Sequence, residues 1–144
     1  LGASAVLGRV IWGAVADATG RSQLLIMVLA FAMATVTLLT GLITPEWSSI
    51  SIFILCGVFG ATGAAWNGIY LAEITRHVAT EDVSRATGGG LFVTFFGVVV
   101  APPIFGLIIN LTNSFETAYI ALGSATMLIG LLLLKNQRKL GVNT

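Results

Sequence analysis

The chain has 144 residues, of which 56% are apolar and only 9% are charged, whereas soluble domains carry roughly 25% charged residues. So few charges cannot cover the surface of a soluble domain, and the composition predicts an all-α integral membrane protein. The seven basic residues are scattered and leave a net charge of +1, which excludes a phosphate-tracking surface for nucleic acid. Cys56 is the only cysteine, so an internal disulfide and a cysteine-based metal cluster are also excluded.

Long apolar runs predict one partial and four full membrane spans, because about 20 apolar residues match a hydrocarbon core of roughly 30 Å. The predicted spans are residues 1–16 (partial), 22–43, 50–72, 87–109 and 118–134. Polar loops are expected at residues 17–21 and 73–86, with a basic tail at 135–144. Because the first apolar run is too short to cross a bilayer, we expect a fragment whose N-terminal part lies outside this sequence.

The distribution of charge predicts the orientation in the membrane. With these spans, all the basic residues fall on or near one side: Arg9, Arg21, Arg76, Arg85, Lys135, Arg138 and Lys139. The turns on the opposite side hold Glu46 and Glu116 and no basic residue. Basic residues concentrate in cytoplasmic loops. We therefore expect the two polar loops and the C-terminus to be cytoplasmic, in a cell (plasma or inner) membrane.

A short motif overlaps the end of the first apolar run and continues into the polar loop. It reads Gly13-x-x-x-Asp17-x-x-Gly20-Arg21 and resembles the loop motif between paired helices of the major facilitator superfamily of transporters. The basic residue that usually follows the Asp of the family motif is Ala18 here. This weaker form is the one associated with the C-terminal half of the family fold. An ordinary cytoplasmic turn, with Gly20 ending a helix, is the alternative reading.

Two later stretches carry the same resemblance. Residues 66–73, followed by Arg85, resemble the family's tenth helix and the loop after it. Gly97-x-x-x-Ala101-Pro102-Pro103-x-x-Gly106 resembles a relaxed form of a Gly-x-x-x-Gly-Pro pattern found in antiporter members. Two prolines inside a membrane helix remove backbone hydrogen bonds and predict a kink. A purely structural kink explains this pattern as well, so antiport is not inferred from it.

The resemblance implies a fold and a function. The spans correspond to helices eight (partial) to twelve, in the C-terminal half of the fold; the other register, helices two to six, would place the basic tail in the central loop. The implied function is secondary active transport of a small solute by alternating access. The implied partners are that solute, a coupling ion such as a proton, the lipid bilayer and the missing N-terminal half. The resemblance implies no enzyme activity and no cofactor.

Three residues of the third span are candidate substrate or cavity contacts. Asn67 is an amide in an apolar helix, and such a group needs a polar partner or a cavity. By the family architecture the tenth helix lines the central cavity, so Asn67, Tyr70 and Trp66 are the candidates. Asn67 lies toward the cytoplasmic end of the span, which favours a gate contact over a central one. An interhelical hydrogen bond is the alternative role for Asn67.

The cytoplasmic charges suggest a latch that closes this side of the protein. Its expected members are Asp17 and Arg21 in the motif, with Arg9, Glu73 and Arg85. Arg9 lies about two turns inside its helix, where it can extend to the interface or pair with Glu73. The alternative is that these are solvated loop charges.

Other functional classes find less support in the sequence. The glycines at 88–90 lack the Lys and the Ser or Thr of a phosphate-binding loop. No nucleophile–base set predicts an intramembrane hydrolase, and no filter-like stretch predicts a channel. A non-transporting helical anchor or assembly subunit is the strongest alternative, although it would not need a kinked helix and paired charged loops.

Overall fold

The structure is a computed structural model that describes residues 2–63 and 65–139, and this part of the chain is helical, without strands. The helices follow the apolar runs, since a backbone in lipid must satisfy its hydrogen bonds within its own segment. They are α1 (Gly2–Thr19), α2 (Ser22–Gly41), α3 (Ser49–Gly63), α4 (Trp66–His77), α5 (Val83–Thr112) and α6 (Phe115–Lys139).

Among the described residues, four helical segments are long and apolar enough to cross a membrane. They are Ser22–Gly41, Ser49–His77, Val83–Thr112 and Phe115–Lys135. The second of these joins α3 and α4, with Ala65 in a turn between them. The all-helical membrane architecture predicted from composition is therefore confirmed.

The helices extend further into the polar segments than the apolar runs suggest. Asp17 lies in the last turns of α1, not in a loop at 17–21. Glu73 lies in α4, and the connection between α4 and α5 is limited to residues 78–82. Apolar length marks the hydrocarbon core, whereas the helix continues through the interface, where charged residues are tolerated. The expected tail is helical from Lys135 to Lys139, and residues 140–144 lie outside the described part.

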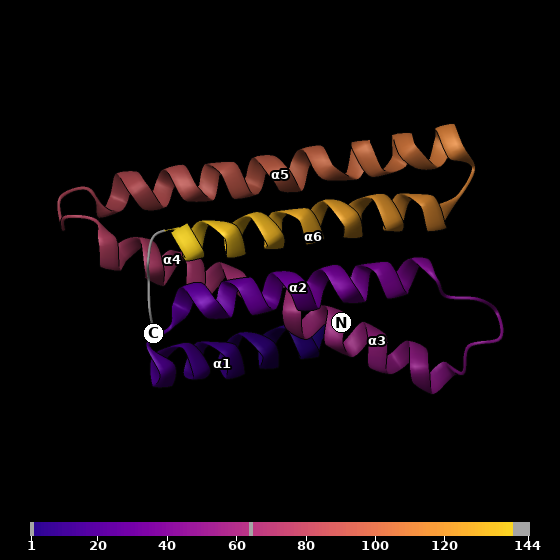
Figure 1. Cartoon of the computed structure of the whole chain (residues 1–144), viewed down its shortest axis with the longest axis horizontal. Coiled ribbons are helices and arrows are strands. Elements are labelled where there is room, and N and C mark those ends of the chain that lie inside the picture. The colour runs from indigo at the N-terminus through magenta and orange to yellow at the C-terminus, as the bar shows by residue number, and fades with distance from the viewer. Residues whose placement is uncertain (1, 64, 140–144) are drawn as a thin grey trace.

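The helices run along the long axis of the molecule, with their connections at its two ends (Figure 1). The α1–α2 and α4–α5 connections and the end of α6 lie at one end, which contains Arg21, Arg76, Arg85 and Lys135. The α2–α3 and α5–α6 connections lie at the other end. This separation agrees with the charge asymmetry of the sequence.

The antiparallel α2 and α6 form the most extensive helix pair (Figure 1). Leu38 of α2 lies over Gly123 of α6, and a Cβ added to Gly123 would be 2.7 Å from the Leu38 Cγ. The ring of Phe31 lies over Gly130. Without hydrophobic drive between helices in lipid, small residues that permit close backbone approach promote such packing.

A second close contact joins α1 to α3. Gly8 is buried, and a Cβ added to it would overlap the backbone of Ala61. Toward the other end of α1, a small core includes Ala16, Leu29 and Ile69, from α1, α2 and α4. These contacts fix α1, α2, α3 and α4 against one another.

Helix α5 stands at the edge of the bundle (Figure 1). Gly90 is the one buried residue of this 30-residue helix. A Cβ on Gly90 would lie 3.2 Å from the Tyr70 hydroxyl, so α5 meets α4 closely at this level. Farther along α5, large apolar side chains such as Phe92 and Val99 are more than 70% exposed within this chain.

Candidate functional site: the charged end of the bundle and the groove beside α5

The motif turn joins α1 to α2 at the basic end of the bundle. Gly20 has a φ of 63°, a left-handed conformation that glycine adopts without a Cβ penalty, and its N–H donates to the Ala16 carbonyl at 2.9 Å. This geometry ends α1 and turns the chain directly into α2. Gly13, one of the motif glycines, meets no neighbouring atom within 4 Å of an added Cβ.

Asp17 makes its ion pair with Arg76, which is a residue outside the predicted latch. The Arg76 Nη2 and the Asp17 Oδ1 are 3.8 Å apart. The Arg76 Nη1 also donates a hydrogen bond of 3.3 Å to the Ser22 hydroxyl, and Ser22 is only 3% exposed. The end of α4 is therefore tied to both sides of the α1–α2 turn.

The other predicted latch residues are arranged differently. Glu73 faces His77, one turn further along α4, with 3.7 Å between a Glu73 carboxylate oxygen and the His77 Nδ1. Within the described residues, Arg21 and Arg85 form no ion pair. Arg9 lies eight residues before Asp17 in α1, about 12 Å along the helix axis. The structure thus joins Asp17 to α4, but through Arg76.

The sequence contained a signal for Arg76. It is one helical turn after Glu73 in an i, i+3 relation, and it becomes part of the helix once α4 is extended past residue 72. Because the span was predicted to end at residue 72, Arg76 was assigned to the loop, and its helical i, i+3 relation to Glu73 was not recognised.

The three candidate cavity residues lie at the start of α4. The rings of Trp66 and Tyr70 are 5.9 Å apart and tilted by 52°, and Tyr70 also packs against Gly90 of α5. Asn67 is half-buried, and its side chain makes no hydrogen bond within the described part of the chain. The two aromatic residues thus have packing roles, whereas Asn67 retains free hydrogen-bonding capacity.

Helix α5 continues through both prolines. Pro102 and Pro103 lie inside the single helix Val83–Thr112, and each lacks a backbone N–H donor. Gly97 and Gly106, which flank them, meet no neighbouring atom within 4 Å of an added Cβ. The bend expected from the proline pair therefore remains a prediction.

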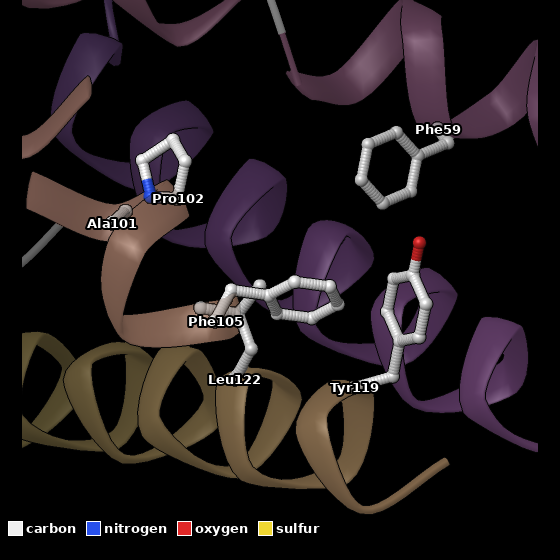
Figure 2. Close-up of a pocket in the computed structure, with 6 residues that line it drawn as sticks. All are labelled: Phe59, Ala101, Pro102, Phe105, Tyr119 and Leu122. Atoms are coloured by element: carbon white, nitrogen blue, oxygen red, sulfur yellow. The ribbon is translucent and has the colours of Figure 1, made fainter. Parts of the chain in front are cut away.

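An apolar groove opens beside these prolines (Figure 2). Its volume is about 320 Å³. It is lined by residues of α3, α5 and α6, namely Phe59, Ala101, Pro102, Phe105, Tyr119 and Leu122. Phe105 and Tyr119 meet edge to face, with ring centroids 5.1 Å apart. This groove was not predicted from the sequence, because it depends on how three helices are spaced.

The described residues contain no cluster of three or more His, Cys, Asp or Glu side chains able to hold a metal ion. These residues provide an ion pair between helix ends, an amide side chain without a hydrogen-bond partner among them, and an apolar groove.

Comparisons with known proteins place this arrangement in a family. The chain is 29% identical, over 134 residues, to monocarboxylate transporter 9 from Gallus gallus; the match covers 93% of this chain and 26% of that protein. The chain thus spans about a quarter of the length of the relative it matches. No solved structure matches it. The family model of the Major Facilitator Superfamily matches residues 1–143, and the chain belongs to this superfamily of membrane transporters.

Proposed function

We propose that the chain is the C-terminal part of a secondary transporter that moves a small solute across the membrane by alternating access. The observation that carries the proposal is the family match over residues 1–143. The order of the three sequence motifs supports the C-terminal register. The quarter-length match to the relative supports a longer parent protein that supplies the other half of the transport path.

For the substrate we propose a small monocarboxylate, with a proton as the coupling ion. The proposed substrate rests on the name of the relative, monocarboxylate transporter 9. A proton moving with the anion would make each cycle electroneutral, so that the membrane potential would not oppose uptake of the negative charge.

The test is uptake of radiolabelled monocarboxylates by the intact protein in liposomes, with and without an inward proton gradient. We expect saturable accumulation that the gradient increases. Accumulation of a different solute from a panel would contradict the substrate proposal alone. A folded intact protein that moves none of the panel solutes would favour the anchor or assembly subunit instead. Residues 1–144 alone should carry no flux, because alternating access needs both halves.

We propose that Asn67 contacts the substrate or gate. It lies in the first turn of α4, is half-buried, and its amide has no hydrogen-bond partner within the described residues. In an apolar helix, a polar group without an internal partner is expected to face a cavity. An interhelical hydrogen bond to the rest of the parent protein is the competing role.

We further propose that the basic end is cytoplasmic and that the Asp17–Arg76–Ser22 contacts hold α4 against the α1–α2 turn when that side is closed. The contacts join helices of one half of the fold. They would therefore act by fixing the position of α4, and would not bridge the two halves directly. Arg21, Arg85 and Glu73 lie at the same end, where the missing half could supply their partners. If this orientation is correct, a reporter that works only in the cytoplasm should be active when it is fused after residue 144.

A further inference from the structure

One face of α6 changes from apolar to basic along its length. Gly130 marks the side of α6 that lies against α2, because the Phe31 ring of α2 lies over it. Lys135 comes five residues later, about 140° away around the helix. Leu128 and Leu131 precede Lys135 by seven and four residues, so the three share this outer face of α6. All three are exposed within this chain, with Leu128 at 58% and Leu131 at 49%.

The helix continues beyond its apolar segment. The part of α6 that is long and apolar enough to span a membrane ends at Lys135, whereas the helix ends at Lys139. Four residues add about 6 Å along the axis, and the headgroup region extends roughly 5–7 Å beyond the hydrocarbon core on each side. Arg138 and Lys139 follow Lys135 at positions i+3 and i+4, which belong to the same face of a helix. The apolar stripe of the outer face therefore ends in three basic positions at the depth of lipid headgroups.

These charges are not neutralised by the helix pair to which they belong. Within the described residues Lys135 forms no ion pair. Helix α2 contains no acidic residue, and the one acidic residue of α6 is Glu116 in its first turn, at the opposite end. Asp17, which lies at the basic end, is paired with Arg76. The outer face of α6 thus needs an anion from outside this helix pair.

The combination of apolar and basic parts indicates the chemistry of the ligand. Basic residues next to a membrane helix attract anionic lipids, and the acyl chain of such a lipid would cover Leu128 and Leu131 while its phosphate accepts hydrogen bonds from Lys135. A free phosphate matches only the basic part of this face. A zwitterionic lipid carries its own ammonium group, which opposes the attraction.

We propose that the outer face of α6 binds an anionic phospholipid. Its phosphate is held by Lys135 and attracted by the further charges of Arg138 and Lys139, and its acyl chain lies along Leu128 and Leu131. The proposal rests on the proposed function only for the leaflet, which is the cytoplasmic one in the proposed orientation. A bound lipid would fix the end of α6, and with it the α2–α6 pair, at the membrane surface.

The test uses the intact parent protein in detergent, to which phosphatidylglycerol is added. The thermal unfolding midpoint is followed against lipid concentration, and each variant is compared with its own lipid-free midpoint. We expect phosphatidylglycerol to raise the midpoint. Lys135→Gln with Lys139→Gln should weaken its apparent affinity about 30-fold, since each basic residue contributes about 1 kcal/mol near an anionic surface. Arg21→Gln with Arg85→Gln removes the same charge at the same end of the bundle and should keep the original affinity.

A charge-conserving variant separates lipid binding from folding. Lys135→Arg with Lys139→Arg should retain the affinity for phosphatidylglycerol. An equal rise of the midpoint with phosphatidylcholine or with inorganic phosphate would overturn the proposal, as would equal weakening by the two Gln variants or no rise with phosphatidylglycerol. Phosphatidylglycerol binding at this face in a protein that transports nothing would leave the inference correct and contradict the proposed function.

Discussion

Helix pair α2–α6 and helix α5 have similarly apolar sequences, but only the pair finds its neighbours inside this chain. Seven of the 20 residues of α2 are buried, including Leu29 and Thr37, whereas only Gly90 is buried in the 30 residues of α5. Apolar composition is thus a requirement of the lipid environment and does not identify packing faces. Helix contacts in a membrane are identified by close approach at small residues, as at Gly123.

The largest effect is expected from adding one carbon at the close contact. Gly123→Ala places a Cβ 2.7 Å from the Leu38 Cγ and 3.1 Å from the Leu38 backbone N, and such overpacking costs about 1–3 kcal/mol. Gly97→Ala in α5 meets no atom within 4 Å and should be neutral or stabilising by up to about 1 kcal/mol. Thermal unfolding of the intact protein in detergent measures both. Equal destabilisation by the two variants would contradict the comparison.

The next effect concerns transport. Asn67→Ala should reduce kcat/KM about tenfold, the loss of roughly 1.4 kcal/mol expected for one hydrogen bond to a charged or polar substrate. The unfolding midpoint should not fall, because Asn67 has no hydrogen-bond partner within the described residues. Gly68→Ala, at the adjacent exposed position with open space around it, serves as the control. A lowered midpoint with unchanged transport kinetics would assign Asn67 to interhelical packing.

The smallest effect is expected at the charged end. Asp17 is 81% exposed, so its coupling to Arg76 in a double-mutant cycle of Asp17→Asn and Arg76→Gln should be about 0.2–1 kcal/mol. If the contact holds α4 in the closed state, either variant should also increase labelling of Asn67→Cys from the cytoplasmic side in a Cys56→Ala background. Glu81→Gln, which removes an exposed carboxylate of the α4–α5 connection that has no ion pair within the described residues, provides the matched control. Labelling that increases equally in all three variants would show a general charge effect.

The sequence predicted the class of fold because the lengths of the apolar runs and the side preference of basic residues follow directly from the bilayer. It did not predict helix ends, since Asp17 and Glu73 remain helical beyond the hydrocarbon core. The predicted latch stays a prediction: Asp17 contacts α4, but through Arg76, which was missed because its contact depends on the helical phase at the end of α4. The groove at Tyr119 depends on the spacing of three helices, which no local pattern contains.

The Gly123–Leu38 and Gly130–Phe31 contacts also determine which changes of length the α2–α6 pair can accept. The two contacts are seven residues apart on both helices, and seven residues are close to two turns. Inserting one residue between Gly123 and Gly130 would rotate one glycine by about 100° away from α2. Inserting seven residues would restore the rotation but would move Gly130 about 10 Å along the axis, away from Phe31. Homologous chains that keep both contacts should therefore have the same number of residues between these two glycines, unless α2 carries a matching change of length.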